Sequence, residues 1–169
     1  MSVIIREYQD SDFVAVVNLM ENLQNYFSGI DADPKHIPFK SREHSVRYMI
    51  NAIDDCNSMN GKFYVAETKS DGIIGFSSGV LIDHSNPNPY YDYTHERSLE
   101  GAIGLLYVSE KFRRSGVAIS LIEEINSYFK DSKCHSVTLL VASTNASAVE
   151  FYKRSEMVIV EHKMRILLD

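Results

Sequence analysis

One stretch of the sequence constrains the fold more than any other. Residues 101–108 are an uninterrupted run of apolar residues and glycine, and an amphipathic helical pattern follows after a short polar turn. A strand that is apolar throughout leaves no face for water, so helices must cover both of its sides. The run is also far shorter than the roughly 20 apolar residues of a membrane-spanning helix. It predicts a buried central strand of an α/β fold and no membrane partner.

The rest of the chain supplies helical and strand periodicities that would surround this strand. Helices are indicated where apolar residues recur every three or four positions, and strands where short β-rich runs end at turn residues. No linker or repeat interrupts the sequence, which predicts one domain over 1–169 with a mixed sheet and helices on both faces. The expected strands are 3–6, 62–68, 72–82, 101–108, 137–142 and one or two within 157–168; the expected helices are 13–27, one around 46–53, 112–129 and 145–154.

The charges are divided unevenly along the chain. The formal net charge is −6, but residues 1–110 carry 16 acids and 8 bases (−8), whereas residues 111–169 carry 7 acids and 9 bases (+2). A negative total argues against nucleic acid as a partner, because phosphates are neutralised by clustered cations. The split indicates that the two halves face different ligands, although scattered surface charge explains it equally well.

Cysteine, histidine and the N-terminus point to a cytoplasmic protein without a metal. Cys56 and Cys134 stand alone, and the six histidines show no metal-ligand spacing. The chain reaches charge at Arg6, too early for the apolar core of a secretory signal.

The turn after the central strand is the most informative chemical feature. It is rich in cations and small residues from Arg113 to Gly116, and it opens directly into a helix. The N–H groups at a helix start lack intrahelical partners and the helix dipole adds positive charge there, so phosphate is the natural ligand. Gly116 permits close approach of the backbone to such a group. A capped helix start with two solvated arginines explains the pattern almost as well.

This turn fits neither of two well-known phosphate-binding patterns. It lacks Gly-x-x-x-x-Gly-Lys-Ser/Thr, and it has one glycine where the dinucleotide fingerprint has three. Arg113-x-x-Gly116-x-Ala118 instead resembles motif A of the GNAT superfamily of acyl-CoA-dependent N-acyltransferases. In that family the preceding strand usually ends Leu-x-Val, as 106–108 do here.

A second match to the GNAT superfamily lies downstream. The family commonly has Asn-x-x-Ala followed by an aromatic-Tyr pair, and this chain has Asn145, Ala148, Phe151 and Tyr152 at that spacing. The matches occur in the family's order and on the expected elements, over residues 101–153. The resemblance implies a GNAT-like fold, with the order β-α-α-β-β-β-α-β-α-β and central parallel strands that splay apart.

The resemblance also implies a binding site for acetyl-CoA as cosubstrate. Main-chain groups of the strand end would bond the pantetheine arm, the helix start would cradle the pyrophosphate, and the later motif would hydrogen-bond and pack against the ligand. The implied cofactor-binding residues are Leu106, Tyr107, Val108, Arg113, Arg114, Ser115, Gly116, Val117, Ala118, Ile119, Ser120, Asn145, Ala148 and Phe151.

Tyr152 is the expected catalytic acid. By the resemblance it would lie near the sulfur and protonate the departing CoA thiolate, while the N–H of Val108 would hold the oxyanion. By itself, Tyr152 is better explained as a helix tyrosine that packs against the edge of a core. The seven-residue spacing from Asn145 favours the catalytic role.

The general base is less defined. Some family members carry a glutamate on the central strand, at about the places of Ala102 or Gly104 here. Glu100 is the nearest carboxylate and is the first candidate for the catalytic base. The alternatives are Glu96, His95 or a chain of water molecules that leads to solvent.

One departure from the family concerns the end of the last helix. Many members close it with Leu-Gly-Phe, whose glycine takes a left-handed conformation. Here the sequence reads Lys-Arg-Ser-Glu-Met over 153–157, and we assign Ser155 to the glycine position.

These features together predict a single-domain N-acetyltransferase in which a neutral amine attacks acetyl-CoA directly in a ternary complex. Carboxylates and tyrosines in the first half suit a cationic acceptor, such as a small amine or a lysine peptide. A non-catalytic acetyl-CoA-binding or sensing module and a dimer scaffold are the alternatives, and a homodimer stays open. The residues on the expected acceptor side are Glu21, Tyr26, Asp31, Asp33, Asp83, Tyr90, Tyr91, Asp92, Tyr93, Glu96 and Glu100.

Overall fold

The computed structural model describes residues 2–30, 41–84, 99–162 and 164, and within them a five-stranded sheet forms the centre of the molecule. The strands lie in the order β1-β2-β3-β4-β5; the first four are antiparallel, and β5 runs parallel to β4. This is the mixed sheet that the sequence predicts. The strands are β1 (Val3–Glu7), β2 (Lys62–Thr68), β3 (Gly72–Asp83), β4 (Leu99–Val108) and β5 (Ser136–Leu139).

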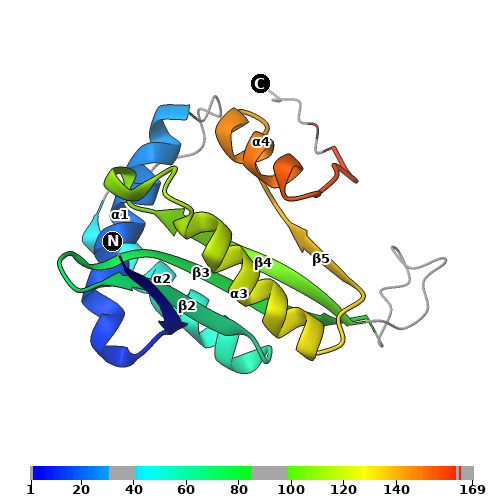
Figure 1. Ribbon diagram of the computed structural model, residues 1–169, viewed down its shortest axis with the longest axis horizontal. Coiled ribbons are helices and arrows are strands. Elements are labelled where there is room, and N and C mark those ends of the chain that lie inside the picture. The colour runs from blue at the N-terminus through cyan, green and yellow to red at the C-terminus, as the bar shows by residue number, and fades with distance from the viewer. Residues whose placement is uncertain (1, 31–40, 85–98, 163, 165–169) are drawn as a thin grey trace, which may run out of the picture.

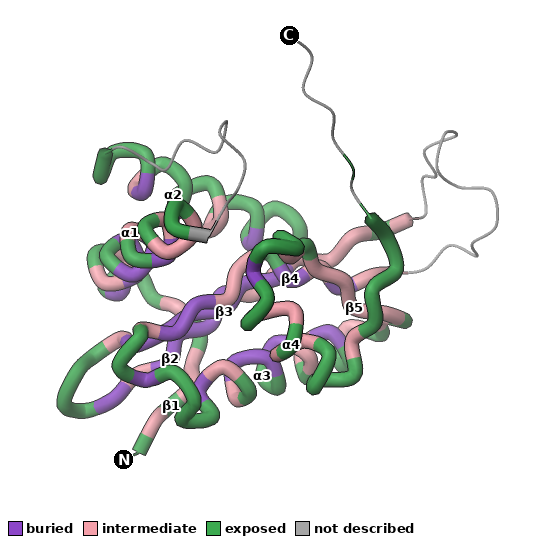
Figure 2. The backbone as a smooth tube through the Cα atoms, turned by 90° about the horizontal axis from the view of Figure 1, so that it is seen from above, coloured by how far each residue is buried: buried purple, intermediate pink, exposed green. Residues whose placement is uncertain are grey.

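Helices cover both faces of the sheet, as Figures 1 and 2 show. Helices α1 (Phe13–Ile30) and α2 (Arg42–Ser58) pack on one face, and α3 (Val117–Asp131) packs on the other. Helix α4 (Ala146–Arg154) follows β5 and lies on the α3 side (Figure 2). The expected fold class, an α/β domain with helices on both faces of a mixed sheet, is confirmed.

The central strand is buried on both sides, which is why its sequence is apolar throughout. Tyr107 of β4 belongs to the core under α1 and α2, whereas Ile103 and Val108 belong to the core under α3. A Cβ at Gly101 would lie 2.5 Å from the ring of Phe129, so a glycine lets α3 pack this closely against the strand.

The second half of β4 has a register shift on one side and an unpaired edge on the other. The register against β3 shifts between Ser78 and Gly79 and leaves Gly104 without a Cα partner. On the other side, β5 pairs with β4 only through Glu100–Ile103. From Gly104 to Val108, therefore, no described strand covers this edge of β4, and the two parallel strands diverge towards α4 (Figure 1).

Several predicted boundaries differ from the observed ones. Helix α3 begins at Val117 rather than at 112, because residues 110–112 form a short 3-10 turn (η2) and Gly116 takes a left-handed φ of 90° that interrupts the helix. Strand β4 begins two residues earlier than expected, and β5 ends at Leu139 rather than at 142.

The strand expected within 157–168 is wrong for the residues that the structure describes there. Residues 157–162 and 164 are not in a strand, and Val158, Ile159 and Val160 are exposed. A β-branched run favours extended backbone, but a strand also needs a partner and a packing surface. The sequence of this segment has the propensity for a strand, but the described residues give it no neighbouring strand with which to pair.

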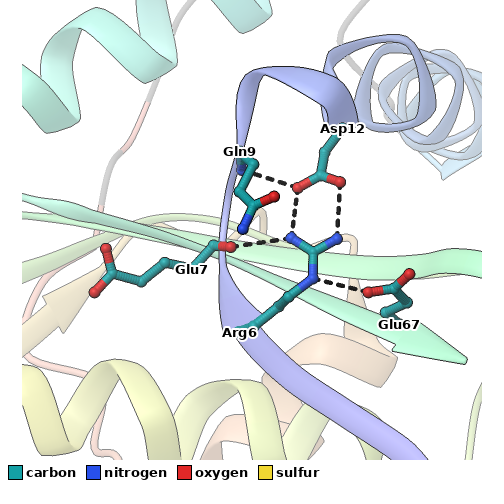
Figure 3. Close-up of polar contacts among 5 residues, drawn as sticks. All are labelled: Arg6, Glu7, Gln9, Asp12 and Glu67. Carbon is teal, nitrogen blue, oxygen red and sulfur yellow. Dashed lines mark hydrogen bonds and ion pairs between the residues drawn. The ribbon is translucent and has the colours of Figure 1, made fainter.

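A cluster of polar contacts joins the edge of the sheet to the start of α1 (Figure 3). Arg6 of β1 donates to both carboxylate oxygens of Asp12 at 2.7 and 2.8 Å, and its Nε donates to Glu67 at 2.8 Å. Asp12, only 6% exposed, also accepts from the N–H of Gln9. The Arg6 guanidinium lowers the pKa of the Asp12 carboxyl below its ordinary value.

Asp12→Asn should destabilise the fold at pH 7 by about 1–3 kcal/mol, because it weakens a buried charge-assisted pair. Since the folded-state pKa of Asp12 is depressed, its contribution is present above the ordinary pKa of about 4 and is lost as the pH falls below it. The stabilities of wild type and variant, measured by urea unfolding, should thus begin to converge as the pH falls below about 4. Glu67→Gln, at a more exposed carboxylate, should cost less than about 1 kcal/mol. A difference for Asp12→Asn that stays constant down to pH 3 would contradict this assignment.

The end of α4 corrects the assignment of its cap. The left-handed residue is Glu156, with φ 64°, and Ser155 keeps a φ of −89°. The N–H of Met157 donates to the carbonyl of Tyr152, and that of Glu156 donates to Lys153, which together form a Schellman motif. The glycine position of the family pattern therefore corresponds to Glu156, one residue after the predicted Ser155.

Glu156→Gly should stabilise the protein by about 0.5–1 kcal/mol, because glycine adopts the left-handed conformation without the cost that a Cβ imposes. Ser155→Gly is the control at the neighbouring position, where φ is negative: glycine there adds freedom to the unfolded chain and removes the hydrogen bond from Ser155 Oγ to the carbonyl of Phe151. Thermal unfolding should separate the two variants in opposite directions. Equal destabilisation by both would show that Glu156 is not strained.

Candidate active site

The turn between β4 and α3 is shaped to receive an anion. Arg114 and Gly116 both have positive φ, 61° and 90°, and residues 113–116 are exposed. The helix closes its first hydrogen bond from the N–H of Ser120 to the carbonyl of Gly116. The N–H groups ahead of Ser120 lie in the first turn, where a helix has no acceptor of its own for them. Successive N–H groups in such a turn form a concave, positively polarised site.

Glycine at position 116 is required by its conformation. A Cβ built there meets nothing within 4 Å, so space is not the constraint in the free protein. The φ of 90° is one that other residues rarely adopt. The same open space leaves room for a phosphate against the backbone, so the residues present fit the pyrophosphate of CoA.

Arg113 holds the end of the strand. Its Nε donates to the carbonyl of Val108 at 3.3 Å, and its guanidinium carbon lies 5.0 Å from the ring centre of Tyr26 and 5.8 Å from that of Tyr107. The neighbouring Arg114 is exposed beside the helix start. Within the described residues Arg113 thus makes contacts inside the protein, and Arg114 is the arginine that we expect to face a ligand.

The open edge of β4 presents main-chain groups. The N–H of Ser109 donates to Ile74 of β3, so the alternation of the strand directs the N–H and carbonyl of Val108 to the opposite, open side. Arg113 donates a hydrogen bond to the carbonyl of Val108, while the N–H of Val108 faces the space between the diverging strands. Leu106, two residues earlier, points its main-chain groups the same way.

The downstream motif lies on α4, as the sequence predicts. Asn145 is 7% exposed and caps the helix: its Oδ1 accepts from the N–H of Ala148 at 3.3 Å and from Ser147 Oγ at 3.2 Å. Phe151 and Tyr152 lie edge to face, 5.2 Å apart, and pack against the core under α3. Burial raises the pKa of Tyr152 to about 12, so its hydroxyl keeps its proton at neutral pH.

The structure places Glu100 at the far end of β4 from this turn. Thr138 donates to its Oε1 at 2.7 Å, and His84 Nε2 lies 3.7 Å from its Oε2. Eight residues of strand separate it from Val108, a span of about 26 Å, and four separate it from Gly104, about 13 Å. The alternative bases His95 and Glu96 lie outside the described residues. The base is therefore the least supported of the predicted roles.

The expected acceptor side is described only in part. Asp31, Asp33, Tyr90, Tyr91, Asp92 and Tyr93 lie outside the described residues. Glu21 on α1 forms an ion pair with Arg42 of α2 at 3.1 Å, so its charge is shared within the protein. Tyr26, in contrast, contacts the site directly: its hydroxyl donates to Asn145 Oδ1 at 3.2 Å. These residues are 119 positions apart, and no local pattern in the sequence signals such a contact.

Two cavities accompany these elements. One, of about 450 Å³, is lined by Tyr26, Tyr107, Ser109 and Arg113 together with residues of α1. The other, of about 320 Å³, lies beside the C-terminal half of α3 and β5 and contains none of the predicted site residues. We therefore associate the first with the site.

Metal and membrane features are not found in the described part of the chain. Over 2–30, 41–84, 99–162 and 164, no group of three or more His, Cys, Asp or Glu side chains is placed to hold a metal ion. In the same ranges no helix has both the length and the apolar composition that crossing a membrane requires.

Comparisons with known proteins show the family of this chain. The sequence model of the acetyltransferase (GNAT) family matches residues 20–156. A histone acetyltransferase of Arabidopsis thaliana, MCC1, is 28% identical in a match 123 residues long, and the match covers 69% of this chain and 49% of that protein. The chain thus spans about half the length of this curated relative.

Two solved structures show the same fold at low identity. A tetramutant of the BH1408 protein from Bacillus halodurans superposes with a TM-score of 0.75 at 21% identity, over 98% of this chain and 99% of the other. Glucosamine-6-phosphate N-acetyltransferase from Arabidopsis thaliana superposes with a TM-score of 0.66 at 16% identity, over all of both chains. With the family match extending over most of the sequence and the motif residues on the elements described above, the chain belongs to the acetyltransferase (GNAT) family.

Proposed function

We propose that this chain transfers the acetyl group of acetyl-CoA to a primary amine. The observation that carries the proposal is that two features lie together where β4 and β5 diverge. An exposed anion cradle with left-handed residues at Arg114 and Gly116 opens on one side, and α4 carries Asn145 and Tyr152 on the other. The cradle suits the pyrophosphate of CoA. The open edge of β4 suits the amide groups of its pantetheine arm, which would add to the sheet like a strand.

The reaction we propose is a direct attack within a ternary complex. The neutral amine nitrogen forms a bond to the thioester carbonyl carbon, and the Val108 N–H stabilises the oxyanion that develops. The C–S bond then breaks, the nitrogen gives up a proton to the base, and CoA leaves as a thiolate that takes up a proton to become the thiol. The products are an N-acetyl amide and CoA, and no covalent enzyme intermediate forms.

Tyr152 and the base divide the proton handling in this scheme. The protonated hydroxyl of Tyr152 donates to the sulfur as negative charge develops on it. For the base we propose Glu100 acting through water, since the length of β4 between it and the open edge excludes direct contact with the amine. Water alone is the alternative carrier of that proton.

A cationic amine is the acceptor class we propose. The first 110 residues carry a balance of −8, which attracts an ammonium group before it loses its proton. An amine acceptor is supported by the names of two similar proteins, a histone acetyltransferase and a glucosamine-6-phosphate N-acetyltransferase. Both names denote acetyl transfer, and they bracket the choice between a lysine side chain and a small amino compound.

The test is turnover with a panel of amines. The purified chain is mixed with acetyl-CoA and, in turn, a polyamine, an amino sugar and a lysine-containing peptide, and the release of CoA thiol is followed. Amine-dependent release supports the proposal. If CoA raises the melting temperature but no amine releases thiol, the chain is a non-catalytic acetyl-CoA-binding module. No shift of the melting temperature at saturating CoA would sink both readings.

A further inference from the structure

Helix α4 is weakly held by the rest of the protein. All nine of its residues are described and none is fully buried: Phe151 and Tyr152 are half-buried against the core under α3. It also follows the point where β5 has left the sheet, so the β-ladder does not fix it. A helix with so few buried contacts needs another constraint to keep a binding geometry.

Tyr26 supplies a contact from the opposite side of the sheet. Its ring stacks on the Arg113 guanidinium, which is bonded to the end of β4, and its hydroxyl reaches Asn145 and Ser147 at the start of α4. One side chain of α1 thus contacts both sides of the gap between β4 and β5: Arg113 after β4, and the start of α4 after β5. It also lines the cavity of about 450 Å³ on this side of the site.

The hydrogen bonds of this contact determine how Asn145 is oriented. Tyr26 Oη, Ser147 Oγ and Asn145 Oδ1 form a triangle with sides of 3.2 Å. The Tyr26 and Ser147 hydroxyls each have one proton to donate, and both can donate it to Asn145 Oδ1. Holding that oxygen fixes the plane of the amide, and with it the direction of the two N–H donors that remain for a ligand.

We propose that Tyr26 is a positioning residue that braces α4 against α1 and sets the Asn145 amide for binding of acetyl-CoA. The inference rests on the proposed function, and it adds to it a link between the helix on the acceptor side and the cofactor motif. Tyr26 touches the residues that bind and touches no reacting atom.

Tyr26→Phe tests the brace, because it removes the hydroxyl and keeps the ring over Arg113. In the free protein, the amide of Ala148, which donates to Asn145, should exchange its hydrogen roughly 2- to 12-fold faster, as expected for one lost hydrogen bond. The dissociation constant for CoA, measured by calorimetry, and the KM for acetyl-CoA should rise by a similar factor. The value of kcat should change less than KM. Ser147→Ala should act in the same direction, and the double variant should be less than additive.

The matched control is Tyr8→Phe. Tyr8 packs on Phe63 beside β1, the strand at the opposite edge of the sheet from β5, so neither CoA affinity nor Ala148 exchange should change. Unchanged exchange in Tyr26→Phe overturns the brace, whatever the wild type binds. Faster exchange with unchanged CoA affinity overturns its role in binding, and so does a fall in kcat alone. If the wild type itself binds no CoA, the proposed function fails, whereas the exchange result still decides whether the brace exists.

Discussion

Gly116→Glu should abolish measurable CoA binding. The substitution forces a side chain into a backbone conformation with φ 90°, which costs about 1–2 kcal/mol. It also places a carboxylate in the space beside the helix start where a pyrophosphate would lie, and like charges at close range repel strongly where water is excluded. Together these effects should weaken CoA binding by about 10³-fold or more. Calorimetric titration with CoA, with the melting temperature as a second readout, measures the loss.

The matched control for Gly116→Glu is Gly72→Glu. Gly72 also has a positive φ, 68°, and a Cβ there also meets nothing within 4 Å, but it is the first residue of β3, after the turn from β2. The two variants should lose similar stability, so a binding defect confined to Gly116→Glu assigns the cradle. Gly116→Ala, which adds strain without charge, should fall between wild type and Gly116→Glu. CoA affinity retained in Gly116→Glu would mean that the turn after β4 is not the phosphate site.

The parts of this structure that the sequence predicts are those fixed by local chemistry. The strand over 101–108 is apolar because both faces are covered, and the helix after it needs Gly116 at its start; both facts are written in adjacent residues. The same holds for Asn145, whose side chain caps the helix that it opens. Local patterns of this kind report which residues share an element, and the element then brings the motif together.

The parts that could not be predicted depend on distant partners. Tyr26 reaches Asn145 across 119 positions, and nothing near either residue signals the contact. The run Val158–Val160 has the composition of a strand, but pairing requires an acceptor strand that the described chain does not place beside it. The left-handed residue at the end of α4 is one position later than predicted, because a glutamate at 156 does not indicate a left-handed backbone.

Glu100 illustrates a third limit, which is distance along a strand. Glu100 lies on the central strand and carries a carboxylate, so the sequence alone predicts it as the general base. The rise of a strand, about 3.3 Å per residue, then separates it from the open edge that begins at Gly104. Its side chain contacts Thr138 of β5 and His84, the residue after β3, which is a structural position at the end of the sheet away from the open edge.

Tyr152→Phe should lower kcat by about 10²-fold while leaving CoA affinity within about threefold of the wild type. Phenylalanine keeps the edge contact with Phe151 and the packing on the core, and it removes only the hydroxyl. Steady-state turnover with the best amine and calorimetry with CoA measure the two quantities.

The pKa of Tyr152 sharpens this prediction. An ordinary thiol has a pKa of about 8.5, so complete transfer of a proton from a tyrosine with a pKa of about 12 to the thiolate is uphill. The hydroxyl therefore acts mainly as a hydrogen-bond donor to the sulfur while the C–S bond breaks, which places the effect at the lower end of the range for acid catalysis. Because burial raises this pKa, the donor form persists to about pH 12, and kcat should show no fall near pH 10 from its ionisation. Tyr64→Phe is the control: Tyr64 also has a pKa raised by burial to about 12, but it lies on β2 and should leave kcat unchanged. Equal turnover of Tyr152→Phe and wild type would remove Tyr152 from the mechanism, and an alkaline limb near pH 10 that disappears in Tyr152→Phe would mean that its environment is not the dry one inferred from its burial.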